Sequence, residues 1–169
     1  MSLKKNIIAF FIISILGTVF HFAYSWSGNN TLAGLFFPVN ESTWEHLKLI
    51  FFPTILYSVF EYLKLDNKPK NYIPATVISI LFAMLITVTL YYTYNGILGF
   101  NIDFFNITIY YIAILFLIIS RSKILKSNKF ISDNSIAFFS IIFILLLLFF
   151  WVWSYNPPNI NIFEPPMPV

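Results

Sequence analysis

The sequence predicts an all-α membrane protein, a bundle of about five transmembrane helices in a single domain. Of its 169 residues, 59% are hydrophobic and only 10% are charged, whereas a soluble domain is about 45–50% apolar and about 25% charged. The apolar residues also fall into long segments, which approach the roughly 20 residues that a helix needs to cross a bilayer. Lipid allows little other than helices for segments of this length, because every backbone polar group must be satisfied within the segment.

Five apolar segments make up the predicted transmembrane domain, which covers residues 1–155. Their approximate bounds are 6–24, 45–64, 72–94, 104–120 and 135–153. The first span follows Lys4 and Lys5, and its end resembles a signal-peptide cleavage site. The apolar run is long for a signal peptide, so we expect the span to be retained. The second span begins at helix-capping residues, the third and fifth contain no charged residue, and the fourth follows Asp103. The tail 156–169 is rich in Pro and Asn, so we expect an extended, non-helical strip on the outer face.

The basic residues predict the orientation of these spans. With the N-terminus in the cytoplasm, nine of the ten Lys and Arg residues fall in cytoplasmic segments and only Lys48 lies outside. Cytoplasmic loops of membrane proteins carry an excess of Lys and Arg, so we predict an N-in, C-out protein of the cell membrane. All four tryptophans then lie at the outer boundary, where aromatic belts form. This distribution of charge gives no reason to expect nucleic-acid binding.

The stretch PVNESTWEHLK, residues 38–48, opens the second span with a concentration of charge. Ser42 and Glu45 have the spacing of a capping box, in which the glutamate bonds the amide of the cap residue. Glu45 also lies three residues before Lys48, as a helical ion pair requires. The uncharged run that follows, residues 49–60, gives about 18 Å of helix against a hydrocarbon core of about 30 Å. Some ionisable groups must therefore lie at membrane depth, where they are costly and usually functional.

The other end of the second span carries Glu61, which lies about 22 Å from His46 along the helix axis. Glu61 therefore cannot join the charged start of the span. It either reaches the inner interface near Lys64 or is neutralised by a partner helix. Between these ends, Pro53 is expected to kink the helix.

Further ionisable residues are predicted at the depth of the charged start. His21 lies near the end of the first span, and Asp103 lies just before the fourth. Two histidines with several carboxylates suit a divalent transition metal such as zinc, manganese or iron. The candidate ligands are His21, Glu41, Glu45, His46 and Asp103. Glu41, Glu45 and His46 equally suit acid–base catalysis in a partly dry pocket. The EHxxK spacing lacks the second histidine of the HExxH motif, so no known metal signature supports the set.

Three stretches of the sequence resemble a known family. They are HFAYSWSGNNTLAGLFFPVNESTWEHLKLIFFP, the following FEYLKL, and SYNPPNINIF near the end of the chain. They are similar to a family of small uncharacterised prokaryotic multi-pass membrane proteins, which carry a PVNESxWEHLK block after the first span and are grouped as a domain of unknown function. The resemblance is close over residues 17–65 and looser near the end, where the chain stops at EPPMPV. It implies no activity, only that the block is the signature of the family.

Three functions are compatible with these observations. The leading interpretation is a structural or regulatory membrane subunit, whose capped second span binds a protein partner or a second copy of the chain. The first alternative is a membrane-embedded hydrolase or transferase that acts on a lipid or an exported substrate through the metal or acid–base residues. The second alternative is a small-solute permease, although the nearly charge-free third and fifth spans show little of the polar route that a permease needs. No cysteine, GxSxG elbow, P-loop or dinucleotide loop is present, so the familiar catalytic motifs do not apply.

Overall fold

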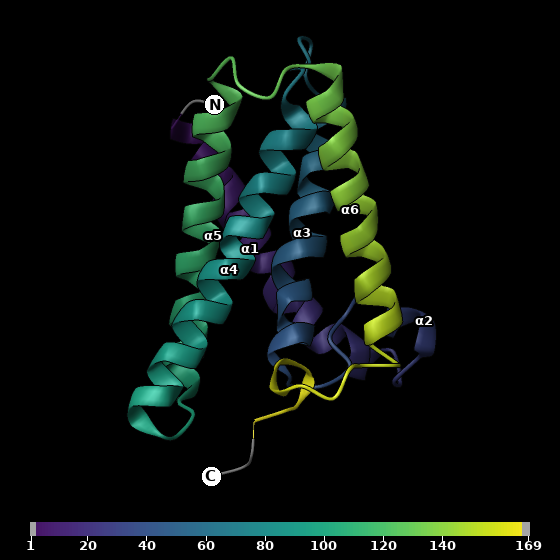
Figure 1. Cartoon of the computed structure of the whole chain (residues 1–169), viewed down its shortest axis with the longest axis vertical. Coiled ribbons are helices and arrows are strands. Elements are labelled where there is room, and N and C mark those ends of the chain that lie inside the picture. Colours follow the sequence, from purple (N-terminus) through teal and green to yellow (C-terminus); the bar gives the residue numbers. More distant parts are fainter. Residues whose placement is uncertain (1–2, 167–169) are drawn as a thin grey trace.

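The computed structural model describes residues 3–166, and every regular element in that range is helical. The five long helices are α1 (Leu3–Trp26), α3 (Thr43–Leu63), α4 (Tyr72–Leu98), α5 (Asp103–Leu125) and α6 (Asp133–Trp153), arranged as Figure 1 shows. The short α2 (Thr31–Gly34) lies in the loop after α1, and one 3₁₀ turn, η1 (Asn161–Phe163), lies near the C-terminus. The predicted all-α class is confirmed.

Four of the long helices in the described chain, α1, α4, α5 and α6, are long and apolar enough to cross a membrane. α3 is of similar length, but Glu45, Lys48 and Glu61 interrupt its apolar sequence. These helices identify a membrane protein, whereas the number of spanning helices and their orientation stay predictions.

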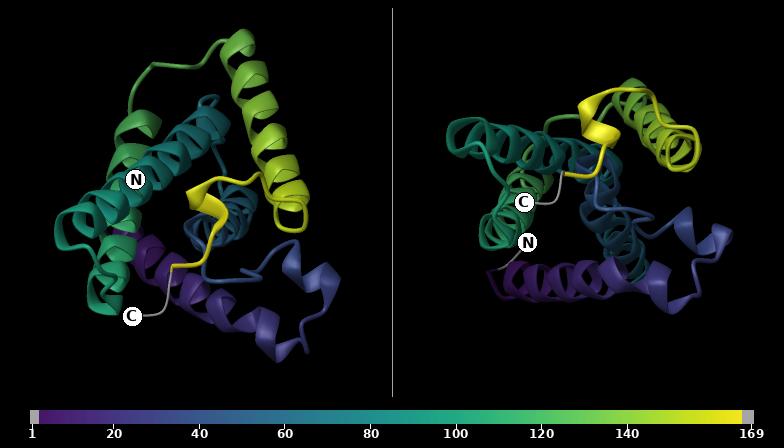
Figure 2. Two further views of the ribbon diagram at one scale, coloured as in Figure 1. Left: turned by 60° about the horizontal axis from the view of Figure 1, so that its bottom comes forward. Right: turned by 90° about the horizontal axis from the view of Figure 1, so that it is seen from below.

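α3 lies at the centre of the bundle, between α1 and α6 (Figure 2). It packs directly against α1 and α4, and most of its turns contribute buried residues, whereas α6 buries only Phe150. Large rings bridge α3 and α6: Phe51 lies 5.0 Å from Phe150 and 5.8 Å from Phe143 between ring centroids. The other helices thus cover the first half of α3, which carries Glu45 and Lys48, whereas Val59, Phe60 and Leu63 of its second half are exposed.

Gly17 lets α1 approach α3 closely. A Cβ atom at this position would lie 2.8 Å from the carbonyl oxygen of Leu49 and would also collide with the hydroxyl of Tyr110. Pro53 has no N–H to donate to that same Leu49 carbonyl, so α1 approaches α3 where one helical hydrogen bond is missing. His21 lies one turn after Gly17 on the same face of α1, and the close approach therefore carries His21 toward the start of α3.

A buried ion pair holds the opposite end of α3. Arg121 of α5 donates to the Glu61 carboxylate at 2.8 Å, and the hydroxyl of Tyr72 donates to the same oxygen at 2.8 Å. Arg121 also donates to Thr76 at 3.1 Å. Of the two alternatives for Glu61, the structure shows neutralisation by a partner helix. Arg121 is only 3% exposed, so its side chain lies inside the helix bundle and not in an exposed loop.

The C-terminal tail differs from the wholly extended strip that its proline content suggested. Between the two Pro-Pro pairs the chain forms η1, and Phe163 of this turn packs on Trp44 and Trp153, with ring centroids 5.0 and 5.5 Å apart. The proline-free run between those pairs is long enough for one 3₁₀ turn, and burial of the Phe163 ring stabilises it. The tail is thereby fixed against the start of α3.

Candidate metal site

The site is built at the end of the bundle where α1 and α6 finish and α3 begins, called the site end below. Ser42 caps α3, because its hydroxyl accepts a hydrogen bond from the Glu45 amide at 3.3 Å. The second half of the predicted capping box is replaced by other contacts. The Ser42 amide donates to Asn40 at 2.9 Å, and the Glu45 carboxylate accepts instead from the amide of Val39 at 2.9 Å. The cap therefore fixes the loop before α3 as well as the helix itself.

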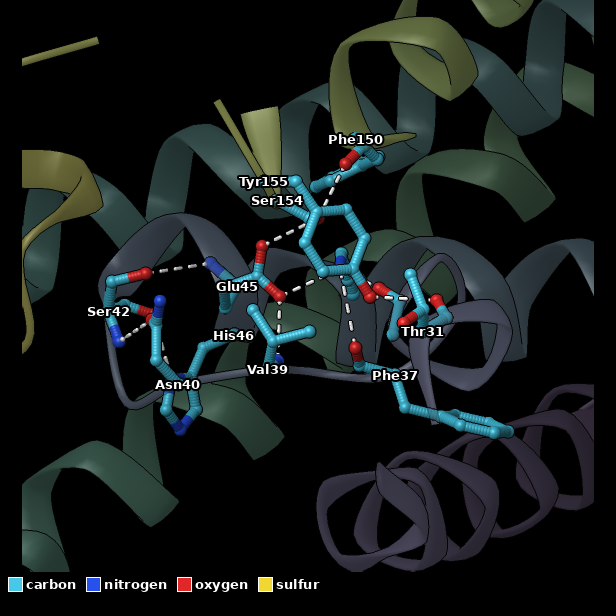
Figure 3. Close-up of polar contacts among 12 residues, drawn as sticks. Thr31, Phe37, Val39, Asn40, Ser42, Glu45, His46, Phe150, Ser154 and Tyr155 are labelled. Carbon is cyan, nitrogen blue, oxygen red and sulfur yellow. Dashed lines mark hydrogen bonds and ion pairs between the residues drawn. The ribbon is translucent and has the colours of Figure 1, made fainter. Parts of the chain in front are cut away.

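Glu45 lies in a closed polar cluster. Its carboxylate pairs with Lys48 at 2.7 Å and accepts a hydrogen bond from the hydroxyl of Ser154 at 2.9 Å. Figure 3 shows this carboxylate reaching toward Ser154 and Val39. The Lys48 ammonium also donates to the carbonyl of Gly34 at 2.7 Å. Glu45 and Lys48 are 2% and 0% exposed, so this pair ties α3 to the α2 loop and to the end of α6.

His46, the next residue, faces an open group. Its Nδ1 lies 2.9 Å from the Ser42 carbonyl, and its Nε2 lies 3.3 Å from a Glu41 carboxylate oxygen. A carbonyl and a carboxylate both accept hydrogen bonds, but a neutral imidazole has only one N–H to donate. The two contacts are satisfied together only by an imidazolium, or by a neutral ring whose Nε2 shares a cation with Glu41.

His21 completes the group from α1. Its ring centroid lies 5.3 Å from that of His46, and its buried Nδ1 has no hydrogen-bond partner within residues 3–166. Ligand atoms of His21, Glu41 and His46 all lie within 4.8 Å of one another. Zinc bonds of about 2.0–2.2 Å place two ligands at most about 4.4 Å apart, so the observed spacing exceeds that limit by only a few tenths of an ångström.

The contact with His46 favours the ionic form of Glu41. The hydrogen bond from His46 holds the pKa of the Glu41 carboxyl below its ordinary value, although partial burial acts in the opposite direction. Metal ligation needs a deprotonated carboxylate. The side chain is 67% exposed, so the third ligand comes from the open side of the group.

A cavity of about 490 Å³ adjoins these ligands. It lies between the end of α1 and the segment that leads into α3, and it is lined by His21, Phe22, Tyr24, Ser25, Asn29, Pro38, Val39, Asn40 and Glu41. The lining combines two of the three ligands with amide and hydroxyl groups and with two aromatic rings. A bound ion would therefore be reached by a substrate that carries both polar and apolar parts.

Two of the predicted ligands lie outside this group. Glu45 is turned into the closed cluster, where both of its oxygens already have partners. Asp103 is exposed at the first turn of α5 and does not belong to the group that meets within 4.8 Å. The structure thus gathers three of the five candidates. Ser42 was predicted as the helix cap, but the contact of its carbonyl with His46 was not predicted, although it follows from the four-residue helical spacing.

A model of one protein family matches residues 1–168. The chain belongs to DUF6512, a family of unknown function. This result confirms that the chain is a member of an uncharacterised family. No curated protein and no solved structure matches the chain. DUF6512 supplies no activity, so the chemistry has to be inferred from the site itself.

Proposed function

We propose that this chain is a multi-pass protein of the cell membrane that binds a divalent transition metal through His21, Glu41 and His46 and uses it for hydrolysis or group transfer. The convergence of these three side chains beside one open cavity carries the proposal. Catalytic zinc sites have three protein ligands and keep the fourth position for water or substrate. Two imidazoles and one carboxylate are a ligand set of this kind.

The surroundings of the ligands support this chemistry. The Ser42 carbonyl accepts from Nδ1 of His46, which leaves Nε2 as the metal-binding atom and orients the ring, as carbonyl groups do behind metal-bound histidines. A bound zinc ion lowers the pKa of its water to about 7 and so supplies a nucleophile at neutral pH. The amides of Asn29 and Asn40, which line the cavity, are available to hold polar groups of a substrate.

The distribution of charge supports an outer location for the site end. Nine of the ten basic residues belong to the other end of the bundle in the N-in arrangement, and all of them except the buried Arg121 are exposed there, which is the cytoplasmic pattern. The exception, Lys48, is fully buried and paired with Glu45, so it exposes no positive charge at the site end. In this arrangement α3 is the fifth span; its charged groups are paired inside the protein, whereas Leu56, Val59 and Phe60 of its second half are exposed.

Elemental analysis of the detergent-purified full-length chain tests the metal. After equilibration with zinc and removal of free ion, we expect about one zinc per chain, and loss of that zinc in His21→Ala and His46→Ala. The control is Glu164→Gln, which removes an exposed carboxylate of the tail and should keep the metal. Equal zinc in the wild type and in His46→Ala would contradict the proposal.

A partner-binding subunit is the second candidate, favoured by the rigid construction of the same end. Trp44 is 8% exposed and held by Phe150 and Phe163, and the Glu45–Lys48 pair fixes three segments around the start of α3. A rigid outer end of this kind presents a surface of fixed shape, to which a protein partner or a second copy of the chain can bind. This function predicts that the chain binds no metal. It also predicts that the chain co-purifies in a complex, and that the His46→Ala variant still assembles into that complex.

A further inference from the structure

We propose that the ligand of this site is a lipid of the outer leaflet, with its polar headgroup in the cavity and its acyl chain along α1. The inference deepens the proposed function, because it names the substrate class of the same site. It decides between the lipid and the exported soluble substrate that the sequence left open.

The two faces of α1 place the site at the edge of the bundle. One face is buried against the neighbouring helices and contains Ala9, Ile13, Ser14 and Gly17. The other face carries a stripe of exposed apolar side chains at helical spacing: Ile15 (61% exposed), Val19 (42%), Phe22 (47%) and Trp26 (70%). In a membrane this stripe faces the acyl chains of the lipids. His21 lies on α1 between the buried face and this exposed stripe. It therefore lies at the boundary between protein and lipid.

Phe22 joins the lipid-facing stripe to the cavity. It belongs to the exposed stripe of α1 and also lines the cavity. Its ring stacks on Trp26 with centroids 5.9 Å apart and meets the His21 ring edge-on at 4.9 Å. An acyl chain that lies along the stripe thus ends beside a proposed metal ligand, without crossing a polar barrier.

The rest of the cavity suits a headgroup. Ser25, Asn29 and Asn40 contribute hydroxyl and amide groups to the lining, and Trp26 at its margin is the kind of residue that lies at headgroup level. Apolar groups on the lipid side and polar groups on the other side match an amphipathic ligand. A small polar solute would leave the Phe22 side of the cavity without a partner.

Charge narrows the class of headgroup. Among residues 3–166, Glu41 is the only acidic residue of the lining, and no Lys or Arg lines the cavity. Headgroups with several negative charges are usually held by Arg and Lys, whereas a single divalent metal beside Glu41 offers little net positive charge. The lining therefore favours a neutral or zwitterionic lipid over a polyanionic one.

Native mass spectrometry of the delipidated, zinc-equilibrated full-length chain tests the inference, with dioleoylphosphatidylethanolamine as the probe. Phe22→Ser removes the apolar wall of the cavity and keeps all three proposed metal ligands; because the lost ring also packs on His21, zinc content is measured in every variant. Phe11→Ser is the matched control, because Phe11 is a lipid-facing aromatic ring of the same helix, 58% exposed, that does not line the cavity. We expect Phe22→Ser to weaken lipid binding about tenfold, Phe11→Ser to bind as the wild type does, and zinc content to be equal in all three.

Three results would overturn the inference. Equal lipid affinity of the two serine variants would remove the link between Phe22 and the ligand. Displacement of the lipid by an equal concentration of glycerophosphoethanolamine would identify a soluble substrate, and tighter binding of cardiolipin would contradict the charge argument. Absence of zinc from every sample would overturn the metal function alone, because the difference between Phe22→Ser and Phe11→Ser would still report lipid binding.

Discussion

Glu45 and His46 are neighbours in the sequence and lie in opposite environments. The Glu45 carboxylate is 2% exposed, and three other groups, on Lys48, Val39 and Ser154, satisfy its oxygens. The His46 ring is 33% exposed and faces Glu41 and His21. The buried Nδ1 of His21 has no hydrogen-bond partner in residues 3–166. One side of the α3 start is thus a completed network, and the other side is a group of candidate ligands whose hydrogen bonds are not all satisfied.

The difference separates a structural role from a binding role. A completed buried ion pair leaves nothing for a ligand and contributes to the uniqueness of the fold. An incomplete set of nitrogen and oxygen donors beside a cavity gains its missing partner when an ion or a substrate binds. Consecutive helical positions point about 100° apart, so one turn of helix serves both purposes.

The largest expected effect comes from breaking the closed side. Lys48→Met leaves the Glu45 carboxylate buried without its cation, and loss of one partner of a buried pair costs about 3–5 kcal/mol of unfolding free energy. Chemical unfolding of the purified chain in detergent would measure the loss. Because the loop that carries Glu41 is fixed through Val39 and Gly34, zinc affinity should fall as well.

Two further variants show whether the charge is responsible. Glu45→Gln combined with Lys48→Met removes both charges and should recover most of the lost stability, since no unpaired ion remains. Lys70→Met, at an exposed position, should leave the unfolding free energy unchanged. A single Lys48→Met variant as stable as the wild type would mean that the Glu45 cluster does not hold the site end together.

An intermediate effect is expected from Gly17→Ala, which separates α1 from α3. The added methyl group meets the Leu49 carbonyl and the Tyr110 hydroxyl, and such overpacking costs about 1–3 kcal/mol. The resulting shift of α1 carries His21 away from His46, so we expect zinc affinity to fall about tenfold, the result of about 1.4 kcal/mol of lost binding energy. Unfolding and zinc titration of the same preparation would measure both.

Gly96→Ala is the matched control for this variant. Gly96 lies in a long helix too, but a Cβ atom added there has nothing within 4 Å. We expect no loss of stability and no change in zinc affinity. If Gly17→Ala binds zinc as tightly as Gly96→Ala, the close approach of α1 to α3 does not position His21.

The helical class and the polar start of α3 could be predicted from the sequence because both depend on local patterns. Long apolar segments require helices in lipid, and the spacing of Ser42, Glu45 and Lys48 predicts a cap and an ion pair along one helix. The structure contains the Ser42 cap and the pair at 2.7 Å. The depth argument also predicted a cost for the ionisable groups of α3, and pairing reduces it: Glu45 is 2% exposed beside Lys48, and Glu61 is 11% exposed beside Arg121.

The division of the candidate ligands could not be predicted, because it depends on contacts that are distant in the sequence. Ser154, which holds Glu45 in the closed cluster, is 109 residues away, and Arg121, which neutralises Glu61, is 60 residues away. No local sequence pattern around Ser154 or Arg121 indicates which residue it contacts. Depth alone grouped Glu45 and Asp103 with the histidines, since residues at one level of a bilayer can still lie on different sides of a bundle.

The smallest expected effect tests that last distinction directly. Asp103 begins α5 after Ile102, which provides no side-chain capping hydrogen bond, and a carboxylate in the first turn interacts favourably with the helix dipole by about 0.3–1 kcal/mol. Asp103→Asn should therefore lower stability only slightly and leave zinc affinity unchanged, whereas Glu41→Gln, which removes a carboxylate of the gathered group, should release the metal. Isothermal titration with zinc would compare the two variants. Loss of zinc from Asp103→Asn would show that the start of α5 closes over the site when an ion binds, and the open side of α3 would then be bounded by a fourth protein ligand.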